Sequence, residues 1–135
     1  MLLDGDRMLL MRRAGSGYRD GELSLPAGHL DGGEDAVAGL LRELHEELSI
    51  DADPKSCRLA TILHRAPESS EDDEYLDLFF TVESWLGTPS IGEPDKCTEL
   101  VWVDQDVLPL DIVDYVGAAL RAIRAHESLV LYGWK

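Results

Sequence analysis

The chain has 135 residues, 44% of them hydrophobic, and a formal net charge of -15. This size and apolar content predict a single domain, residues 1–135, whose core needs no disulfide. So negative a charge excludes DNA or RNA polymers as partners, because their binding depends on Lys and Arg neutralising phosphates. No apolar run is long enough to span a bilayer, and the N-terminus lacks the basic-then-apolar layout of a secretion signal, so we expect no membrane association and a cytoplasmic location.

The N-terminal third of the chain predicts a hairpin, a loop and a helix, in that order. Residues 1–3 and 8–12 flank the turn-forming run Asp4-Gly5-Asp6, and residues 23–25 have the composition of a brief strand inside a glycine-rich loop. Apolar side chains then recur at helical spacing, at Val37, Leu40, Leu41, Leu44 and Leu48. With Asp35 at the N-cap position, the pattern predicts a helix from about Ala36 to Leu48.

The rest of the chain alternates strands with loops and ends in a second helix. Strand-like composition is found in residues 58–64, 75–83 and 100–103, and residues 85–97 contain two prolines and two glycines and are predicted to be a loop. A second amphipathic helix is predicted for residues 112–126. The order is that of a mixed α/β domain.

Three carboxylates, Glu43, Glu46 and Glu47, fall within one arc of the first helix, facing away from the leucine stripe. Like charges three or four residues apart cost about 0.2–0.5 kcal/mol per pair, so stability alone does not favour the grouping. A hard cation would make the grouping favourable, because Mg²⁺ and Mn²⁺ prefer oxygen ligands and are often bound by carboxylates and phosphates together. The alternative is an ordinary solvated face, which is the commoner reason for acids on a helix.

The residues around this helix resemble the Nudix box, the pattern G-x5-E-x7-R-E-U-x-E-E-x-G-U in which U is bulky and aliphatic. Gly28 to Glu34 and Arg42 to Ile50 match it at every position except Ser49, which stands where the family has glycine. That position lies just past the helix end, where glycine normally supplies a left-handed cap. Flanking segments, residues 9–13, 25–28 and 93–96, also resemble the family, so the similarity covers most of the chain.

The resemblance implies an α/β fold, a Nudix-type α/β/α sandwich with a mixed central sheet between the two predicted helices. It also implies a metal-dependent hydrolase that cleaves the pyrophosphate bond of a nucleoside diphosphate linked to another group, as in a nucleoside triphosphate, a nucleotide sugar or a dinucleotide. Two alternatives remain: a Nudix-like sensor that binds a nucleotide without turnover, and a non-enzymatic acidic metal-binding module. The intact acid cluster argues against the first, and the glycine-rich box loop would be unexplained by the second.

By resemblance, the cofactor is Mg²⁺ or Mn²⁺ and the partner is a small nucleotide. The residues expected to bind metal are Ala27, through its main-chain carbonyl, and Glu43, Glu46, Glu47 and Glu93. The three helix acids are also the expected catalytic residues, and Glu43 or a loop acid would orient or deprotonate the attacking water. Glu34 and Arg42 are expected to form a structural pair that fixes the loop to the helix.

Two further residues are candidates for substrate binding. Arg13 ends a strand that leads toward the site and could reach a phosphate, although a solvated strand-end arginine explains it equally well, and His29 lies inside the box loop. The segment Met1–Leu3 is shorter than the opening strand usual in the family. We therefore expect an uncovered edge there and a homodimer in which a second copy covers it.

Overall fold

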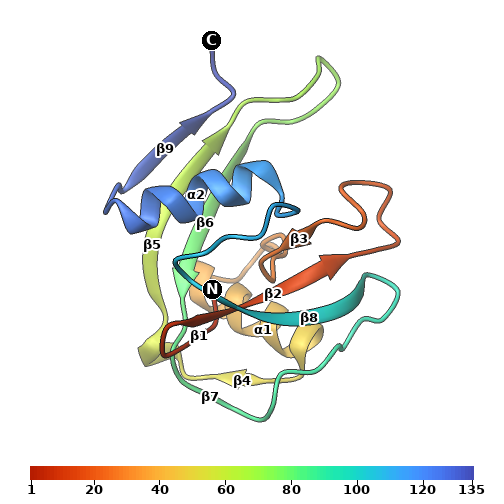
Figure 1. The fold of residues 1–135 in the computed structure, drawn as a ribbon, viewed down its shortest axis with the longest axis vertical. Coiled ribbons are helices and arrows are strands. Elements are labelled where there is room, and N and C mark those ends of the chain that lie inside the picture. Colours follow the sequence, from red (N-terminus) through yellow and green to blue (C-terminus); the bar gives the residue numbers. More distant parts are fainter.

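A computed structural model describes all 135 residues as nine strands, two α-helices and one 3₁₀ turn (Figure 1). The predicted hairpin, box helix and second helix are all present. The elements are β1 (Leu3–Asp4), β2 (Arg7–Arg13), β3 (Leu23–Ser24), α1 (Ala36–Leu48), β4 (Asp51–Ala52), η1 (Pro54–Ser56), β5 (Arg58–Arg65), β6 (Tyr75–Thr81), β7 (Trp85–Leu86), β8 (Cys97–Asp104), α2 (Asp114–Arg124) and β9 (Leu129–Tyr132).

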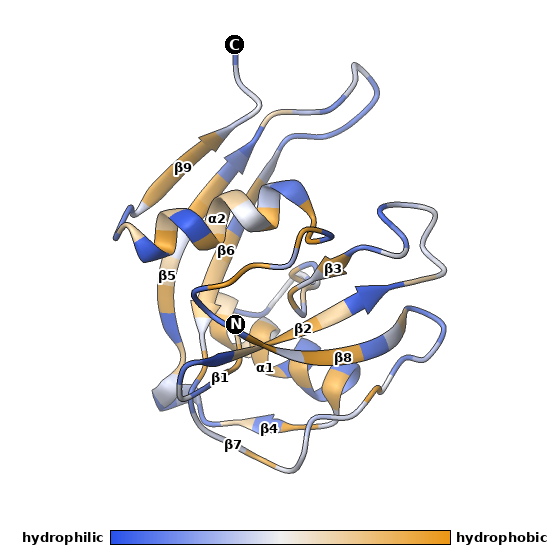
Figure 2. Ribbon diagram, in the orientation of Figure 1, coloured by the Kyte–Doolittle hydropathy of each residue, from blue (hydrophilic) through white to orange (hydrophobic).

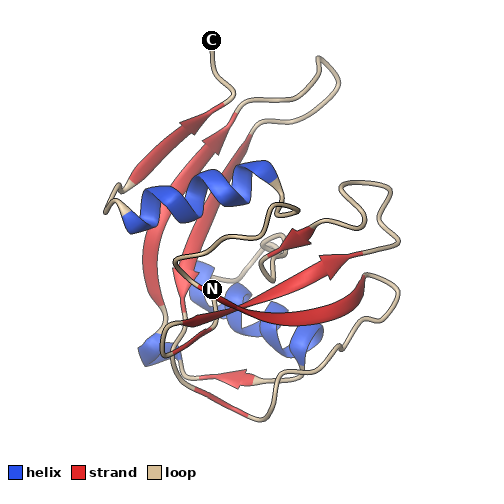
Figure 3. Cartoon of the chain, viewed as in Figure 1, coloured by secondary structure: helices blue, strands red, loops and turns tan.

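The strands form two main sheets and one short ribbon. In the first sheet β2 pairs antiparallel with β1, β3 and β8. In the second, β5 lies between β6 and β9, antiparallel to the former and parallel to the latter, so the sheet is mixed. A parallel bridge between Leu2 and Val82 connects the two sheets, and β4 pairs with β7 at the bottom of the view (Figure 3).

The two helices cover opposite sides of the strands, because β2 sends alternate side chains to different cores. Leu9 packs with Leu44 and Leu48 of α1, whereas Met8 and Leu10 pack in a second cluster that includes residues of α2. Both helices show alternating apolar and polar stretches in the hydropathy colouring, as expected for elements with one buried side (Figure 2). This confirms the α/β/α sandwich with a mixed sheet.

Helix α1 has the bounds that its sequence predicts. The Asp35 carboxylate accepts a hydrogen bond from the Ala38 amide at 2.8 Å and so caps the N-terminus. At the other end Ser49 adopts the left-handed conformation, with φ 57° and ψ 36°, and its amide donates to the carbonyl of His45 at 3.0 Å. The serine therefore occupies the cap that glycine would ordinarily supply, and it bears the associated strain.

Several predicted boundaries in the second half are wrong. Helix α2 begins at Asp114 instead of residue 112, because Ile112 forms a parallel bridge to Leu23 and the Val113 amide bonds to the Leu23 carbonyl at 2.8 Å. It also ends two residues earlier than predicted, at Arg124. Some of the predicted loop at 85–97 is strand, because β7 pairs with β4 and β8 already starts at residue 97.

The opening strand does not leave the open edge that its short sequence predicts. On one side β1 pairs with β2, and on the other the Leu3 amide donates to the Val82 carbonyl at 2.9 Å. Leu2 is fully buried, and the Met1 amino group donates to the Phe80 carbonyl at 2.6 Å. The edge on which a homodimer was expected is therefore already paired within the chain. Neither helix has the length and apolar content to cross a membrane.

Candidate active site

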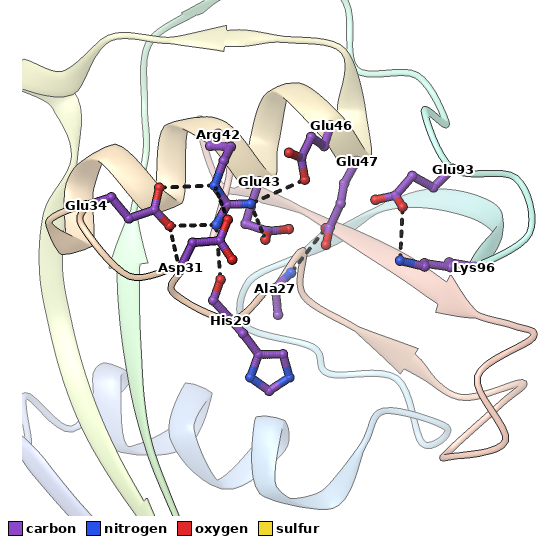
Figure 4. Close-up of polar contacts among 10 residues, drawn as sticks. All are labelled: Ala27, His29, Asp31, Glu34, Arg42, Glu43, Glu46, Glu47, Glu93 and Lys96. Atoms are coloured by element: carbon purple, nitrogen blue, oxygen red, sulfur yellow. Dashed lines mark hydrogen bonds and ion pairs between the residues drawn. The ribbon is translucent and has the colours of Figure 1, made fainter.

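The candidate site lies where the loop after β3 crosses the exposed side of α1 (Figure 4). Gly28 allows this crossing, because a Cβ atom at that position would overlap the carboxyl group of Glu43. Gly39, on the preceding turn of the helix, has a similar role, since its Cβ would overlap the side chain of Leu30. Gly39 therefore lets the box loop pack closely against the helix.

Glu34 and Arg42 are bonded to each other in a two-point ion pair. Arg42 donates from Nη2 to Glu34 Oε1 at 2.7 Å and from Nε to Oε2 at 3.1 Å, and the two side chains are 27% and 16% exposed. Arg42 Nη2 also donates to the His29 carbonyl at 3.0 Å, and Glu34 accepts from the Asp31 amide at 2.8 Å. One arginine thus binds the loop to the helix at several points.

The same arginine reaches the acid cluster. Its Nη1 lies 2.8 Å from Glu43 Oε1 and 3.3 Å from Glu46 Oε2. No three Asp, Glu, His or Cys side chains converge here on one point that could hold a metal, because the guanidinium lies between two of the helix acids. Glu43 is also less exposed than its place on the outer side of the helix suggests, with 18% of its side chain accessible against 49% for Glu46.

Glu47 is the one helix acid of the three that forms no ion pair with Arg42. Its carboxylate accepts a hydrogen bond at Oε2 from the Ala27 amide at 3.2 Å, which places the Ala27 backbone beside it. Burial raises the pKa of Glu47 to about 8, and the nearby negative charges of Glu43 and Glu93 contribute to the rise. Because Glu47 is half-buried and near two other carboxylates, its ionised form is unfavourable. A hard divalent cation at this place would stabilise the ionised form, so the arrangement fits a metal site.

Glu93 reaches the site from the loop before β8. Gly92 packs against the end of α1, its amide donating to the Glu47 carbonyl at 2.8 Å, and this contact brings Glu93 near the helix acids. Glu93 is also paired with Lys96, whose Nζ lies 3.1 Å from Oε2. Sequence reasoning gave Lys96 no role, although its spacing of three residues from Glu93 is a signal for such a pair.

Neither of the two candidate substrate-binding side chains forms a hydrogen bond or an ion pair with the acids. Arg13 is held by its own loop, with Nε donating to the Tyr18 carbonyl at 3.1 Å and the guanidinium 5.7 Å from the Tyr18 ring. The His29 ring points away from the carboxylates and lies 6.1 Å from the ring of Tyr75 (Figure 4). The main chain of His29 therefore helps to hold the loop on the helix through Arg42, whereas its imidazole faces the region around Tyr75.

That neighbouring region contains a stack that the sequence did not reveal. The Arg65 guanidinium lies 4.7 Å from the ring centre of Tyr75 and 4.0 Å from that of Tyr115, and Asp77 fixes it through a bond of 2.6 Å. These residues come from β5, β6 and α2, so no local pattern could have brought them together. They form an aromatic and cationic wall next to His29.

A hollow of about 280 Å³ lies elsewhere, between α2 and the end of β8. It is lined by none of the residues expected at the site, and its Arg124 is paired with Asp106 at 3.3 Å. The chemistry-bearing residues are instead gathered on the open surface of α1 and the loops beside it.

Comparison with known proteins gives a consistent result. The family model described as NUDIX domain matches residues 1–121. The chain is 28% identical over 109 residues to the 8-oxo-dGTP diphosphatase of Escherichia coli strain K12, covering 78% of this chain and 80% of that protein. Among solved structures, a MutT NUDIX hydrolase from Burkholderia pseudomallei superposes with a TM-score of 0.80 at 24% identity, over 89% of this chain and 90% of the other. A MutT protein from Bacillus halodurans gives 0.71 at 21% identity, over 98% and 82%.

Proposed function

The chain belongs to the NUDIX domain family, and on that premise we propose that it is a metal-dependent pyrophosphohydrolase that converts a nucleoside triphosphate and water into a nucleoside monophosphate and pyrophosphate. It is a hydrolase of this family that acts on a pyrophosphate bond. The metal and the substrate class are what we propose beyond this.

The observation that carries the proposal is the acid cluster around Glu47. Burial is the main reason that the pKa of Glu47 rises to about 8, and the neighbouring charges of Glu43 and Glu93 add to the rise, so the ionised carboxylate is unfavourable here without a cation. Nothing in the packing of α1 requires this grouping, because the apolar side of the helix is formed by other residues. With Mg²⁺ and its phosphates bound, the attraction between the carboxylates and the cation would make the same grouping favourable.

Glu43, Glu46 and Glu47, with Glu93 and the Ala27 main chain, would hold the cation. Mg²⁺ supplies charge stabilisation on phosphoryl oxygens and lowers the pKa of water. The protein's own groups fix the geometry: Arg42 holds the loop through Glu34, and Gly28 lets the Glu43 carboxylate lie beneath it. Arg42 also lies within 3.3 Å of two of the acids, and its Nη1 contacts would have to be exchanged for the cation.

A nucleoside triphosphate is the proposed substrate class because the Escherichia coli relative is named an 8-oxo-dGTP diphosphatase. The wall formed by Tyr75, Arg65 and Tyr115 supports a nucleotide, since aromatic rings and a guanidinium plane can stack on a base. In this scheme the substrate is contacted by Arg13 and by His29, whose ring lies beside that of Tyr75.

The test is pyrophosphate release from a panel of nucleoside triphosphates, nucleotide sugars and dinucleotides, with and without Mg²⁺ or Mn²⁺. The parent should release pyrophosphate from a triphosphate only with metal. Changes to partners of metal ligands already cost about 10–100-fold, so Glu47→Gln should lower kcat/KM by about a hundredfold or more. Glu83→Gln is the matched control, because Glu83 is an exposed acid outside the site and loses the same charge.

Three results would contradict the proposal in distinct ways. Nucleotide binding without turnover would indicate a sensor, and metal binding without nucleotide binding would indicate a metal-binding module. Release that is undiminished in Glu47→Gln at saturating Mg²⁺ would remove the acid cluster from the mechanism.

A further inference from the structure

The loop between β2 and β3, residues 14–22, leaves the first sheet, and its tip contacts the second (Figure 1). The Tyr18 hydroxyl donates to Glu68 Oε1 at 2.8 Å, and Arg19 Nη2 donates to the same oxygen at 2.9 Å. Glu68 lies in the loop from β5 to β6, and Arg19 is also 3.2 Å from Asp114, the first residue of α2. One carboxylate thus joins the tip of the β2–β3 loop to the second sheet.

At its base the β2–β3 loop rests on the loop that carries Glu93. The Ala14 amide donates to the Lys96 carbonyl at 2.9 Å, and a Cβ atom on Gly15 would overlap the Asp95 carbonyl oxygen. Gly15 also has φ 64°, a conformation that favours glycine. The β2–β3 loop is therefore attached at one end to the neighbourhood of the acids and at the other to the second sheet.

Hydrogen bonds within the β2–β3 loop hold its tip as one unit. The Asp20 carboxylate accepts from the Ser16 hydroxyl at 2.7 Å and from the Gly17 amide at 2.8 Å, and these bonds hold the pKa of Asp20 below its ordinary value. Arg19 has φ 56°, which an arginine rarely adopts. Such strain persists only where the surroundings enforce it, and it is common at ligand clamps and switch regions.

The tip of the loop lies beside the wall. Tyr18 and Arg13 are near enough to Tyr115 for their charges to contribute to its pKa, which burial raises. Tyr115 and Tyr75 both contact the Arg65 guanidinium. Three of the four tyrosines of the chain are therefore gathered here, two in the wall and one in the tip of the loop.

The same loop holds Arg13. Its Nε donates to the Tyr18 carbonyl at 3.1 Å, and its Nη2 lies 3.4 Å from the Ser16 hydroxyl. Neither contact is with a carboxylate, so the charge of Arg13 is available to an anion. The position of Arg13 depends on Tyr18, and that of Tyr18 depends on Glu68.

We propose that the β2–β3 loop is a lid on the nucleotide site and that Glu68 is a positioning residue, which latches the lid and acts through Tyr18 on Arg13. With the lid closed, a nucleotide on the wall lies against the tip, and Arg13 is held in place to bind phosphate. The Glu68 side chain is 53% exposed, and ion pairs at the surface are weak enough to open and form again. This inference rests on the proposed function for its ligand, whereas the latch can be tested without one.

Trypsin cleavage after Arg19 measures how often the lid opens, because this side chain is 23% exposed and bound while the lid is closed. The rate follows the population of the open form when opening is fast. Glu68→Ala removes both bonds and should raise the rate at which the fragment ending at Arg19 appears by about fivefold, as for the loss of one surface ion pair. Glu71→Ala is the matched control, because Glu71 is an exposed acid of the same loop and forms no ion pair.

A bound nucleotide should keep the lid closed. Deoxyguanosine triphosphate with a methylene group between the α and β phosphates, added with Mg²⁺, should slow cleavage of the parent after Arg19. In steady-state kinetics Glu68→Ala should raise KM by about fivefold and leave kcat within about twofold, because lid closure favours the substrate and the transition state equally. Glu71→Ala should change neither constant.

Circular dichroism would establish that each variant is folded. Equal cleavage of Glu68→Ala and Glu71→Ala overturns the latch, and cleavage that the bound analogue leaves unchanged overturns the lid. Faster cleavage with an unchanged KM overturns the action of Glu68 on Arg13. A parent that hydrolyses no nucleotide contradicts the proposed function instead, and the cleavage rates without nucleotide still decide whether Glu68 holds the loop.

Discussion

Replacing Glu47 by glutamine should change how the stability of the metal-free protein depends on pH. Burial and, after it, the charge of Glu43 raise the pKa of Glu47 from 4.5 to about 8. The folded protein therefore holds this proton more tightly than the unfolded chain does. Glutamine keeps an oxygen that can accept the Ala27 amide but carries no charge.

The sign and size follow from that difference. Below pH 4.5 Glu47 is protonated in both states and costs nothing, whereas between pH 4.5 and 8 the folded state loses stability as pH rises. Each unit by which the pKa of the folded state exceeds that of the unfolded state is worth about 1.4 kcal/mol. Above pH 8 the free energy of unfolding is therefore lowered by at most about 5 kcal/mol. Glu47→Gln should escape this cost, and its advantage over the parent should grow through the same window.

Urea denaturation with EDTA, repeated from pH 4 to 9, measures the effect as the difference between variant and parent. Glu46→Gln is the control, because the Glu46 side chain is half exposed and bound to Arg42 at 3.3 Å. If the difference for Glu47→Gln does not grow through this window beyond that for Glu46→Gln, the pKa of Glu47 is not raised and the acids give no support for a cation among them. Adding Mg²⁺ should stabilise the parent more than Glu47→Gln.

Three other substitutions have defined outcomes. Arg42→Lys loses the two-point pair with Glu34 and should lower both the midpoint of urea denaturation and the activity; an unchanged midpoint would show that the pair does not anchor the loop. Gly28→Ala should leave the melting temperature nearly unchanged, because the flexible Glu43 side chain can move aside, but turnover should fall by about a hundredfold as that carboxylate is displaced; equal turnover would argue against a placed Glu43. Ser49→Gly should raise stability by about 0.5–1 kcal/mol, because Ser49 has φ 57°, and a lower melting temperature would contradict the strain assigned to it.

Local patterns in the sequence were sufficient to predict the box helix, and the family resemblance predicted how it is anchored. Helix α1 keeps its predicted ends because the leucine spacing and the Asp35 cap both act within a few residues. Glu34 directly precedes the Asp35 cap and Arg42 lies within the helix, and the resemblance to the Nudix box predicted that the two would pair. Agreement between such local preferences and the final fold is what makes them predictable.

Contacts between distant segments could not be predicted in this way. Strand β9 has only four residues, and it becomes a strand by pairing in parallel with β5, more than sixty residues earlier. The bond from Leu3 to Val82 closes the edge that the short first strand was expected to leave open. Likewise, a sequence does not say which way Arg42 turns, although its contacts with Glu43 and Glu46 decide how the acids are arranged.

The proposed reaction is cleavage of the pyrophosphate linkage of a nucleoside triphosphate with the help of a divalent metal. Phosphorus NMR of a nucleoside triphosphate incubated with the parent protein and Mg²⁺ follows every phosphate at once. We expect the signals of a nucleoside monophosphate and of pyrophosphate to grow together, and EDTA to stop both. Orthophosphate and a nucleoside diphosphate as the first products, or a spectrum that does not change for any nucleotide tested, would contradict it.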